Sequence, residues 1–207
     1  MSERRIEAAV LEQLRAAAGD ELPVVARRLQ LGSSGTRTDL AVLGDAFIGF
    51  SIRGSGEPID DLPETLAIQS CYFEHLVAVV DPSHAAVLDP DGLAGAALWT
   101  VDAGGTIEAL SAGAGGEVAY SAWFDLLPPE VRRDLLRPVL ARAEAPTRGE
   151  PPLPPSEFRR AFEESFTARH RDDSGAFWST VGGRAITPAD VTLLDVGPPP
   201  LLLSAIV

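Results

Sequence analysis

The 207-residue sequence contains no lysine, so all 17 of its cationic side chains are arginines. It has one cysteine, Cys71, and no apolar run long enough to cross a bilayer. The absence of lysine excludes mechanisms that need its amine, such as a Schiff base or a P-loop lysine. A single cysteine excludes an internal disulfide and a paired-cysteine metal motif. Cysteine usage therefore gives no indication of an oxidising compartment.

Positive charge is also scarce. The 30 Asp and Glu residues outnumber the arginines, which gives a net charge of −13 and a sequence pI of about 4.6. Proteins bind phosphate backbones through basic side chains, so nucleic acid is a doubtful partner, and we expect protein partners or a homo-oligomer. The first residues are charged and amphipathic rather than apolar, so we expect no signal peptide, no membrane partner and a cytoplasmic location.

Periodicity predicts an α/β fold for the first half of the chain. In the first expected helix Ile6, Val10 and Leu14 share one face, and arginines and glutamates occupy the other. The expected elements are a helix over 3–18, a strand or short helix over 22–31, a hairpin over 38–43 and 46–53, a helix over 62–74, a buried strand over 75–81, and a second hairpin over 96–101 and 106–110. Gly44-Asp45 would form a type II′ turn in the first hairpin.

The second half reads as helical. Residues 122–143 have helical spacing interrupted by prolines, and residues 144–155 form a proline-rich linker. Ser156 is the expected N-cap of a helix whose Phe158, Phe162 and Phe166 form a core stripe, and residues 187–190 fit a capping box. We therefore predict an α/β core over 1–116 and a helical extension over 117–207, with the apolar residues 201–207 buried on this chain or on a partner.

Residues 37–81 carry the most informative pattern. It begins with Arg37-Thr38-Asp39 and continues with a hairpin, Leu62-Pro63, Phe73 and the buried strand 76–80. This series resembles the PD-(D/E)XK, or restriction-endonuclease-like, nuclease superfamily, and within it a family of small uncharacterised bacterial and phage proteins. The resemblance covers about residues 5–100 and implies a restriction-endonuclease-like α/β sandwich around a mixed sheet.

The resemblance also implies a catalytic site. In the superfamily two carboxylates on adjacent strands bind Mg²⁺, and a lysine beside them stabilises developing charge. Asp39 matches the first carboxylate, but Ser51 stands at the glutamate position and Arg53 at the lysine position. A single carboxylate opposite a hydroxyl is a poor Mg²⁺ site. We interpret Asp39, Ser51 and Arg53 as vestigial catalytic positions, with no cofactor expected.

Two other interpretations of these residues stay open. The second carboxylate could come from Asp60, Asp61 or Glu64 near the next helix, in which case Asp39 and Glu64 would be the metal ligands and Mg²⁺ the cofactor. Alternatively, Asp39 could form a structural ion pair with Arg53 or Arg37.

The leading functional hypothesis is a pseudo-nuclease, without enzymatic activity, that acts as a binding or regulatory module in genome defence or mobile-element biology. The alternative is an active metal-dependent DNA or RNA endonuclease with a migrated carboxylate. A third hypothesis is an acidic decoy of nucleic acid that occupies a basic surface on another protein.

Other residue types give weaker signals. The three histidines have no zinc-site spacing, Cys71 is expected in the core, and the three tryptophans suit core contacts better than base stacking. The arginine cluster from Arg132 to Arg142 could touch a phosphate backbone, but it is better explained as a helix face paired with Glu130 and Asp134.

Overall fold

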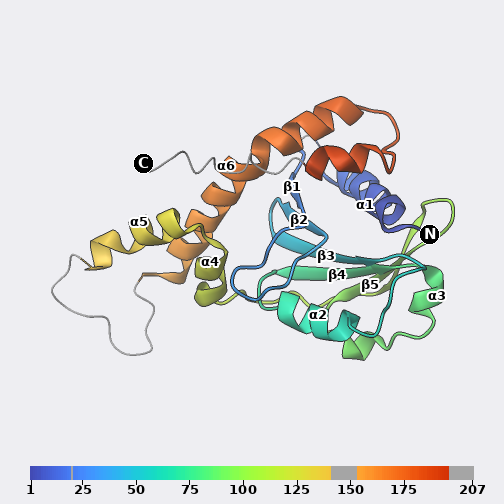
Figure 1. Ribbon diagram of the computed structural model, residues 1–207, viewed down its shortest axis with the longest axis horizontal. Helices are drawn as coiled ribbons and strands as arrows, with labels where there is room; N and C mark the ends of the chain where they lie inside the picture. The colour runs from blue at the N-terminus through green and yellow to red at the C-terminus, as the bar shows by residue number, and fades with distance from the viewer. Residues whose placement is uncertain (20, 141–152, 196–207) are drawn as a thin grey trace, which may run out of the picture.

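The computed structural model describes residues 1–19, 21–140 and 153–195, and shows a mixed α/β fold (Figure 1). In chain order the elements are α1 (Glu3–Ala17), β1 (Val24–Arg27), β2 (Leu40–Leu43), β3 (Phe47–Arg53), α2 (Leu62–Gln69), β4 (His75–Val80), α3 (Pro82–Ala85), the 3-10 helix η1 (Pro90–Gly92), β5 (Ala97–Val101), β6 (Ile107–Ser111), α4 (Tyr120–Leu126), α5 (Pro129–Leu140), α6 (Pro155–Val181) and the 3-10 helix η2 (Asp190–Asp195).

The six strands form one mixed sheet in which they lie side by side in chain order. The β1–β2, β2–β3 and β5–β6 pairs are antiparallel, whereas β3–β4 and β4–β5 are parallel. Parallel neighbours need a crossover connection, which α2 provides between β3 and β4. As a result, the carboxyl ends of β3 and β4 lie at the same end of the sheet as the start of β2.

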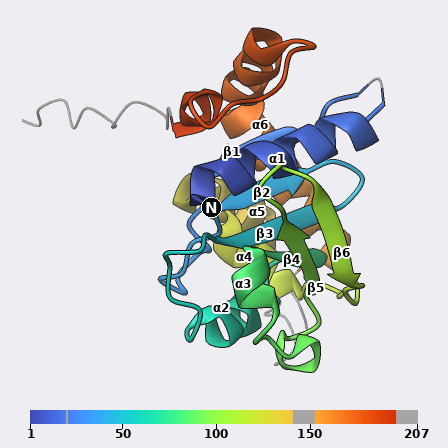
Figure 2. The same cartoon turned by 90° about the vertical axis from the view of Figure 1, so that its right-hand side faces the viewer.

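Both faces of the sheet are covered, because alternate side chains of each strand point to opposite sides. On β3, Phe47 belongs to one buried cluster, and Phe50 and Ile52 belong to the other. The first cluster includes residues of α2, α4 and the amino-terminal half of α6. The second includes residues of α1, the end of α6 and η2. Figures 1 and 2 show α1 and α2 on opposite sides of the sheet.

The 27-residue helix α6 contributes to both clusters and passes the outer edge of β1. Val25 N donates a hydrogen bond to Ser174 Oγ at 3.0 Å, and Trp178 Nε1 donates to the Pro23 carbonyl at 2.9 Å. Free strand edges invite pairing with other chains. Side chains of α6 therefore satisfy edge groups of β1 that would otherwise be open.

The first hairpin is confirmed, but its turn differs from the prediction. Leu43 pairs with Phe47, so three residues connect the strands instead of two. A type II′ turn requires a positive φ at the position of Gly44, and Gly44 does not have one. The three-residue connection therefore follows the strand register and does not use the positive φ that glycine allows.

Several helix and burial predictions are corrected as well. The helix predicted over 62–74 ends at Gln69, and α6 begins at Pro155 with Pro154, not Ser156, as its N-cap. Cys71 is exposed instead of buried in the core. The 187–190 segment makes half of the expected capping box: Thr187 N and Oγ1 donate to Asp190, but Asp190 N donates to the Thr187 carbonyl, and the helix that follows is a 3-10 helix.

Other predictions hold or fall outside the described residues. Residues 22–31 contain a strand, β1, and the second hairpin is β5–β6. The phenylalanine stripe is buried in the first cluster, as predicted. Most of the proline-rich linker and the apolar residues 201–207 lie outside the described residues. Within the described part of the chain, no helix is both long and apolar enough to cross a membrane.

Candidate functional site

The sequence-predicted site lies at the end of the sheet where β2 starts and β3 ends. Asp39 immediately precedes β2, and Asp39 N donates a hydrogen bond to the Phe50 carbonyl at 3.2 Å. The β1–β2 hairpin bends beside it at Arg28, whose φ of 53° lies in the left-handed region, and Arg28 N donates to the Asp39 carbonyl at 2.9 Å. Backbone hydrogen bonds therefore hold Asp39 through both its N–H group and its carbonyl group.

The Asp39 carboxylate is held against the end of β3. Its Oδ2 accepts a hydrogen bond of 2.7 Å from Ile52 N, and its side chain is 24% exposed. Burial raises the pKa of Asp39 above its ordinary value, while the hydrogen bond from Ile52 and the charge of Arg53 act in the opposite direction. Asp39 is thus a partly desolvated carboxylate with a fixed backbone donor.

Arg53 lies between two carboxylates. Its Nη1 is 3.8 Å from Asp39 Oδ2, and its Nη2 is 3.6 Å from Asp61 Oδ2. Nη1 also donates a hydrogen bond of 3.0 Å to the Ile52 carbonyl. The side chain is only 17% exposed, so its charge sits inside the site rather than in solvent. The ion pair with Asp39 that we considered from the sequence is present, whereas Arg37 bonds to Gln30 instead.

Ser51 is fully buried in the middle of the sheet. It pairs with Ala78 of β4 and shares a face of β3 with Phe47, the face that α2 covers. Among the residues that the structure describes, its Oγ has no hydrogen-bond partner. A neutral hydroxyl enclosed in this way contributes no charge to bind a cation.

The acidic residues around the start of α2 are not equivalent. Asp61 precedes α2 and reaches Arg53, with its side chain 61% exposed. Asp60 and Glu64 are exposed, and Glu64 lies in the first turn of the helix, where a carboxylate is favoured by the helix dipole. The structure therefore brings Asp61, rather than Asp60 or Glu64, into ionic contact with the guanidinium that also faces Asp39.

Three functional candidates escaped the sequence analysis: Glu3 and Glu7 on α1, and Arg27 at the end of β1. We expected the glutamates of α1 on its exposed face, but Glu7 is completely buried and its Oε1 lies 2.7 Å from Arg27 Nε. The prediction is wrong for Glu7 because an ion pair, rather than hydrophobicity, accounts for its burial. The only sequence signal is the i, i+4 spacing of the two glutamates, which is also common on exposed helices.

Burial and like charge shift the acid–base properties of α1. The pKa of Glu3 is raised to about 7, first by burial and then by the carboxylates of Asp39, Glu7 and Glu57, while Arg27 opposes the shift. Burial also raises the pKa of Glu7. The site is therefore richer in carboxylates than the sequence pattern alone indicated.

The weaker candidates do not form a second site. His84 Nε2 lies 2.9 Å from the Gly54 carbonyl, a contact with one backbone group. The arginine cluster is paired only partly as expected: Arg137 bonds to Asp134, but Arg132 contacts Asp125 of α4, and Arg142 lies outside the described residues. Among the residues that the structure describes, no group of three His, Cys, Asp or Glu side chains could hold a metal ion.

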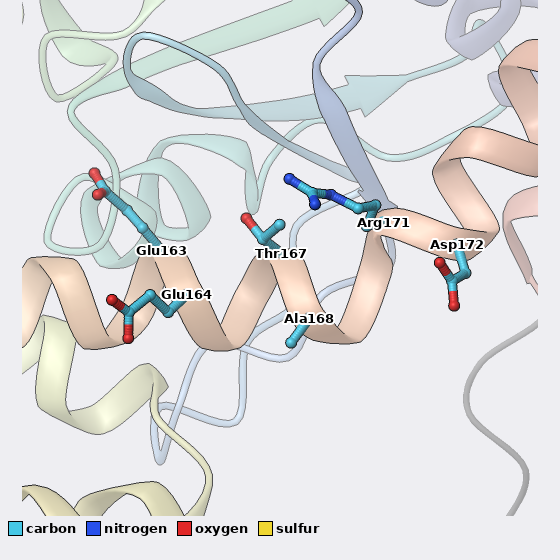
Figure 3. A pocket seen from close by; sticks show the side chains of 6 residues that line it. All are labelled: Glu163, Glu164, Thr167, Ala168, Arg171 and Asp172. Carbon is cyan, nitrogen blue, oxygen red and sulfur yellow. The ribbon is translucent and has the colours of Figure 1, made fainter.

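A surface hollow of about 540 Å³ lies along α6, and none of the site residues described above line it (Figure 3). The side chains that line it all belong to one helix and are mostly polar, so they do not enclose a ligand. They are Glu163, Glu164, Thr167, Ala168, Arg171 and Asp172.

Comparisons with known proteins give little further information. No family model matches the chain, and no curated protein matches it. Among solved structures it is similar to the SPO1766 protein of unknown function from Silicibacter pomeroyi, with 17% sequence identity and a TM-score of 0.47. The match covers 59% of this chain and 78% of that protein. A likeness at this level carries no argument about function. The structure itself shows a mixed α/β fold with a six-stranded mixed sheet.

Proposed function

We propose that the chain is a catalytically degenerate protein of the restriction-endonuclease-like type, which acts as a binding or regulatory module and does not cut nucleic acid. The family resemblance suggests genome defence or mobile elements as its setting. The order of elements from α1 to β4 supports the fold assignment, because it runs helix, three antiparallel strands, helix and a strand parallel to the third.

The observation that carries the proposal is the placement of Arg53. Its guanidinium faces Asp39 at 3.8 Å, so an arginine of the chain, rather than a divalent ion, balances the charge of Asp39. A carboxylate that is already paired attracts a second cation less strongly. Ser51, buried and neutral, does not compensate. Arginine also lacks the compact ammonium of the lysine that the superfamily uses.

A nuclease assay tests the absence of activity. We expect the purified protein, incubated with plasmid DNA or single-stranded RNA in Mg²⁺ or Mn²⁺, to cut no more than Asp39→Ala prepared in parallel. Cleavage by the unaltered chain that Asp39→Ala abolishes would refute the proposal.

A second experiment tests whether position 51 is a vestigial ligand. The double variant Ser51→Glu/Arg53→Lys rebuilds the superfamily pattern beside Asp39. Because carboxylates attract hard cations and amides do so weakly, Mn²⁺ should raise its melting temperature more than that of the matched variant Ser51→Gln/Arg53→Lys. Equal responses of the two variants would count against the assigned position.

The active-nuclease alternative has one specific observation in its favour, the 3.6 Å contact between Arg53 and Asp61. If cleavage is found, this alternative predicts that Asp61→Asn abolishes it. Glu64→Gln is the matched control, since Glu64 is an exposed acid of the same segment.

A further inference from the structure

The two edges of the sheet differ. At the β1 edge, side chains of α6 bond to Val25 N and to the Pro23 carbonyl. At the other edge, none of the described strands pairs with the outer side of β6, which lies at the margin of the sheet in Figure 2. An open edge offers a row of backbone donors and acceptors to an extended segment. The outer side of β6 is therefore a surface to which a strand can be added.

The register of the β5–β6 pair shows which groups of β6 point outward. Asp102 N donates a hydrogen bond of 3.0 Å to the Thr106 carbonyl, so these two residues form a hydrogen-bonded pair. Such pairs alternate along an antiparallel ladder, which directs the N–H and C=O groups of Ile107 and Ala109 away from β5. Leu110 has no partner on β5, because the register shifts beside it, and its side chain is 45% exposed. The edge thus combines outward backbone groups with an exposed apolar side chain.

Residues 201–207 have the composition of a strand that could occupy this edge. They read Leu-Leu-Leu-Ser-Ala-Ile-Val, without a charged side chain, and such an apolar run is expected to be buried. Two chains that each carry a net charge of −13 repel one another, but an uncharged strand adds nothing to that repulsion. Pro198, Pro199 and Pro200 precede the segment, and consecutive prolines favour a stiff, extended spacer. Charge therefore favours this segment as the occupant.

The position of Asp195 decides which copy of the chain supplies the segment. Asp195 bonds to Arg27 at the end of β1, and β6 lies five strands away, which is about 24 Å across the sheet. The six residue steps from Asp195 to Leu201 extend to about 20 Å. The first turn of α1 also stands in the path, since Arg5 bonds to the Ala103 carbonyl between β5 and β6. The segment as a whole therefore falls short of β6 of its own chain.

We propose that the chain forms a dimer in which residues 201–207 of each copy add a strand to the β6 edge of the other. The backbone of the segment bonds to the outward groups of Ile107 and Ala109, and its apolar side chains cover Leu110. This inference rests on the open edge and on the reach of the chain, not on nuclease ancestry. It concerns self-association, so its failure is distinguishable from the failure of the proposed function, which concerns cleavage.

Sedimentation equilibrium of the full chain and of a shortened chain that ends at Pro200 tests the proposal. At about 100 µM we expect the full chain to have twice its monomer mass of 21.8 kDa and the shortened chain to be a monomer. The amides of Ile107 and Ala109 should exchange hydrogen at least about tenfold faster in the shortened chain. A monomeric full chain, or a dimer that survives the truncation, would overturn the proposal.

Two complementary variants identify the surface that is used. Ala109→Pro removes an N–H that points away from β5, so it should fold and stay monomeric, whereas the matched control Ala109→Val keeps the N–H and should form the dimer. The shortened chain keeps the open edge and Ala109→Pro keeps the segment. An equimolar mixture of the two should therefore form a 1:1 complex, although neither associates with itself.

A dimer of Ala109→Pro, or a mixture without the complex, would overturn the proposal, because the copies would then meet through another surface. Circular dichroism of each variant checks that it is folded. If Ala109→Pro does not fold, the mass and the hydrogen exchange of the shortened chain decide.

Discussion

Phe162 provides a direct test of whether the helical extension and the sheet unfold together. It lies on α6 and is 3% exposed. Its ring centroid is 4.7 Å from that of Phe47 on β3 and 4.9 Å from that of Trp123 on α4. One side chain thus joins the predicted extension to the predicted core.

The expected loss is large because the side chain is both buried and aromatic. Truncating a buried phenylalanine to alanine costs about 3–5 kcal/mol through lost transfer free energy and the cavity left behind. Within that total, each well-placed aromatic pair contributes about 0.5–1.5 kcal/mol beyond its buried area. Phe162→Ala should therefore lower the free energy of unfolding by about 3–5 kcal/mol.

Urea unfolding, followed by tryptophan fluorescence and by far-ultraviolet circular dichroism, measures this loss. Glu164→Ala is a matched control, because Glu164 lies on the same helix but is exposed, and should change stability by less than about 0.5 kcal/mol. We expect one transition seen identically by both probes, since α6 is packed into the clusters on both faces of the sheet.

Two results would refute this reasoning. A loss below about 1 kcal/mol would mean that Phe162 is not packed as described. Two separate transitions in Phe162→Ala, with the sheet unaffected by the first, would mean that the extension is an independent unit.

Two glycines and one acid give further predictions. Gly175 lies inside α6 with open space around it, so Gly175→Ala should raise the unfolding free energy by about 0.5–1 kcal/mol. A Cβ on Gly49 would lie 2.6 Å from the Phe73 ring, so Gly49→Ala should lower it by about 1–3 kcal/mol in the same urea assay, and a neutral result would contradict the close packing. The pKa of Glu3 is raised from 4.5 to about 7, so between these two pH values the folded chain holds a proton on Glu3 that the unfolded chain has lost. The free energy of unfolding therefore falls as pH rises through this range, and the contribution of the proton is lost once pH passes 7. Urea midpoints between pH 5 and 8 should therefore fall more steeply for the unaltered chain than for Glu3→Gln; equal slopes would show that Glu3 is not the titrating group.

The sequence was sufficient where structure follows from local periodicity. The alternation along residues 47–53 identified β3 and its two faces, and the four-residue spacing of Phe158, Phe162 and Phe166 identified a buried helix face. The positions of Asp39, Ser51 and Arg53 at one strand pair also followed from the hairpin pattern, because register fixes which residues of two paired strands are neighbours.

Only the tertiary structure decided which charges meet. Glu7 and Arg27 are twenty residues apart, and neither position is distinguished by hydrophobic pattern, yet they form a buried ion pair. Likewise, the contact of Arg53 with Asp61, and the choice of Asp61 over Glu64, depend on where α2 begins relative to β3. Periodicity reports which face of an element avoids water, but the pairing of charges depends on how separate elements pack, and local sequence does not encode that distance.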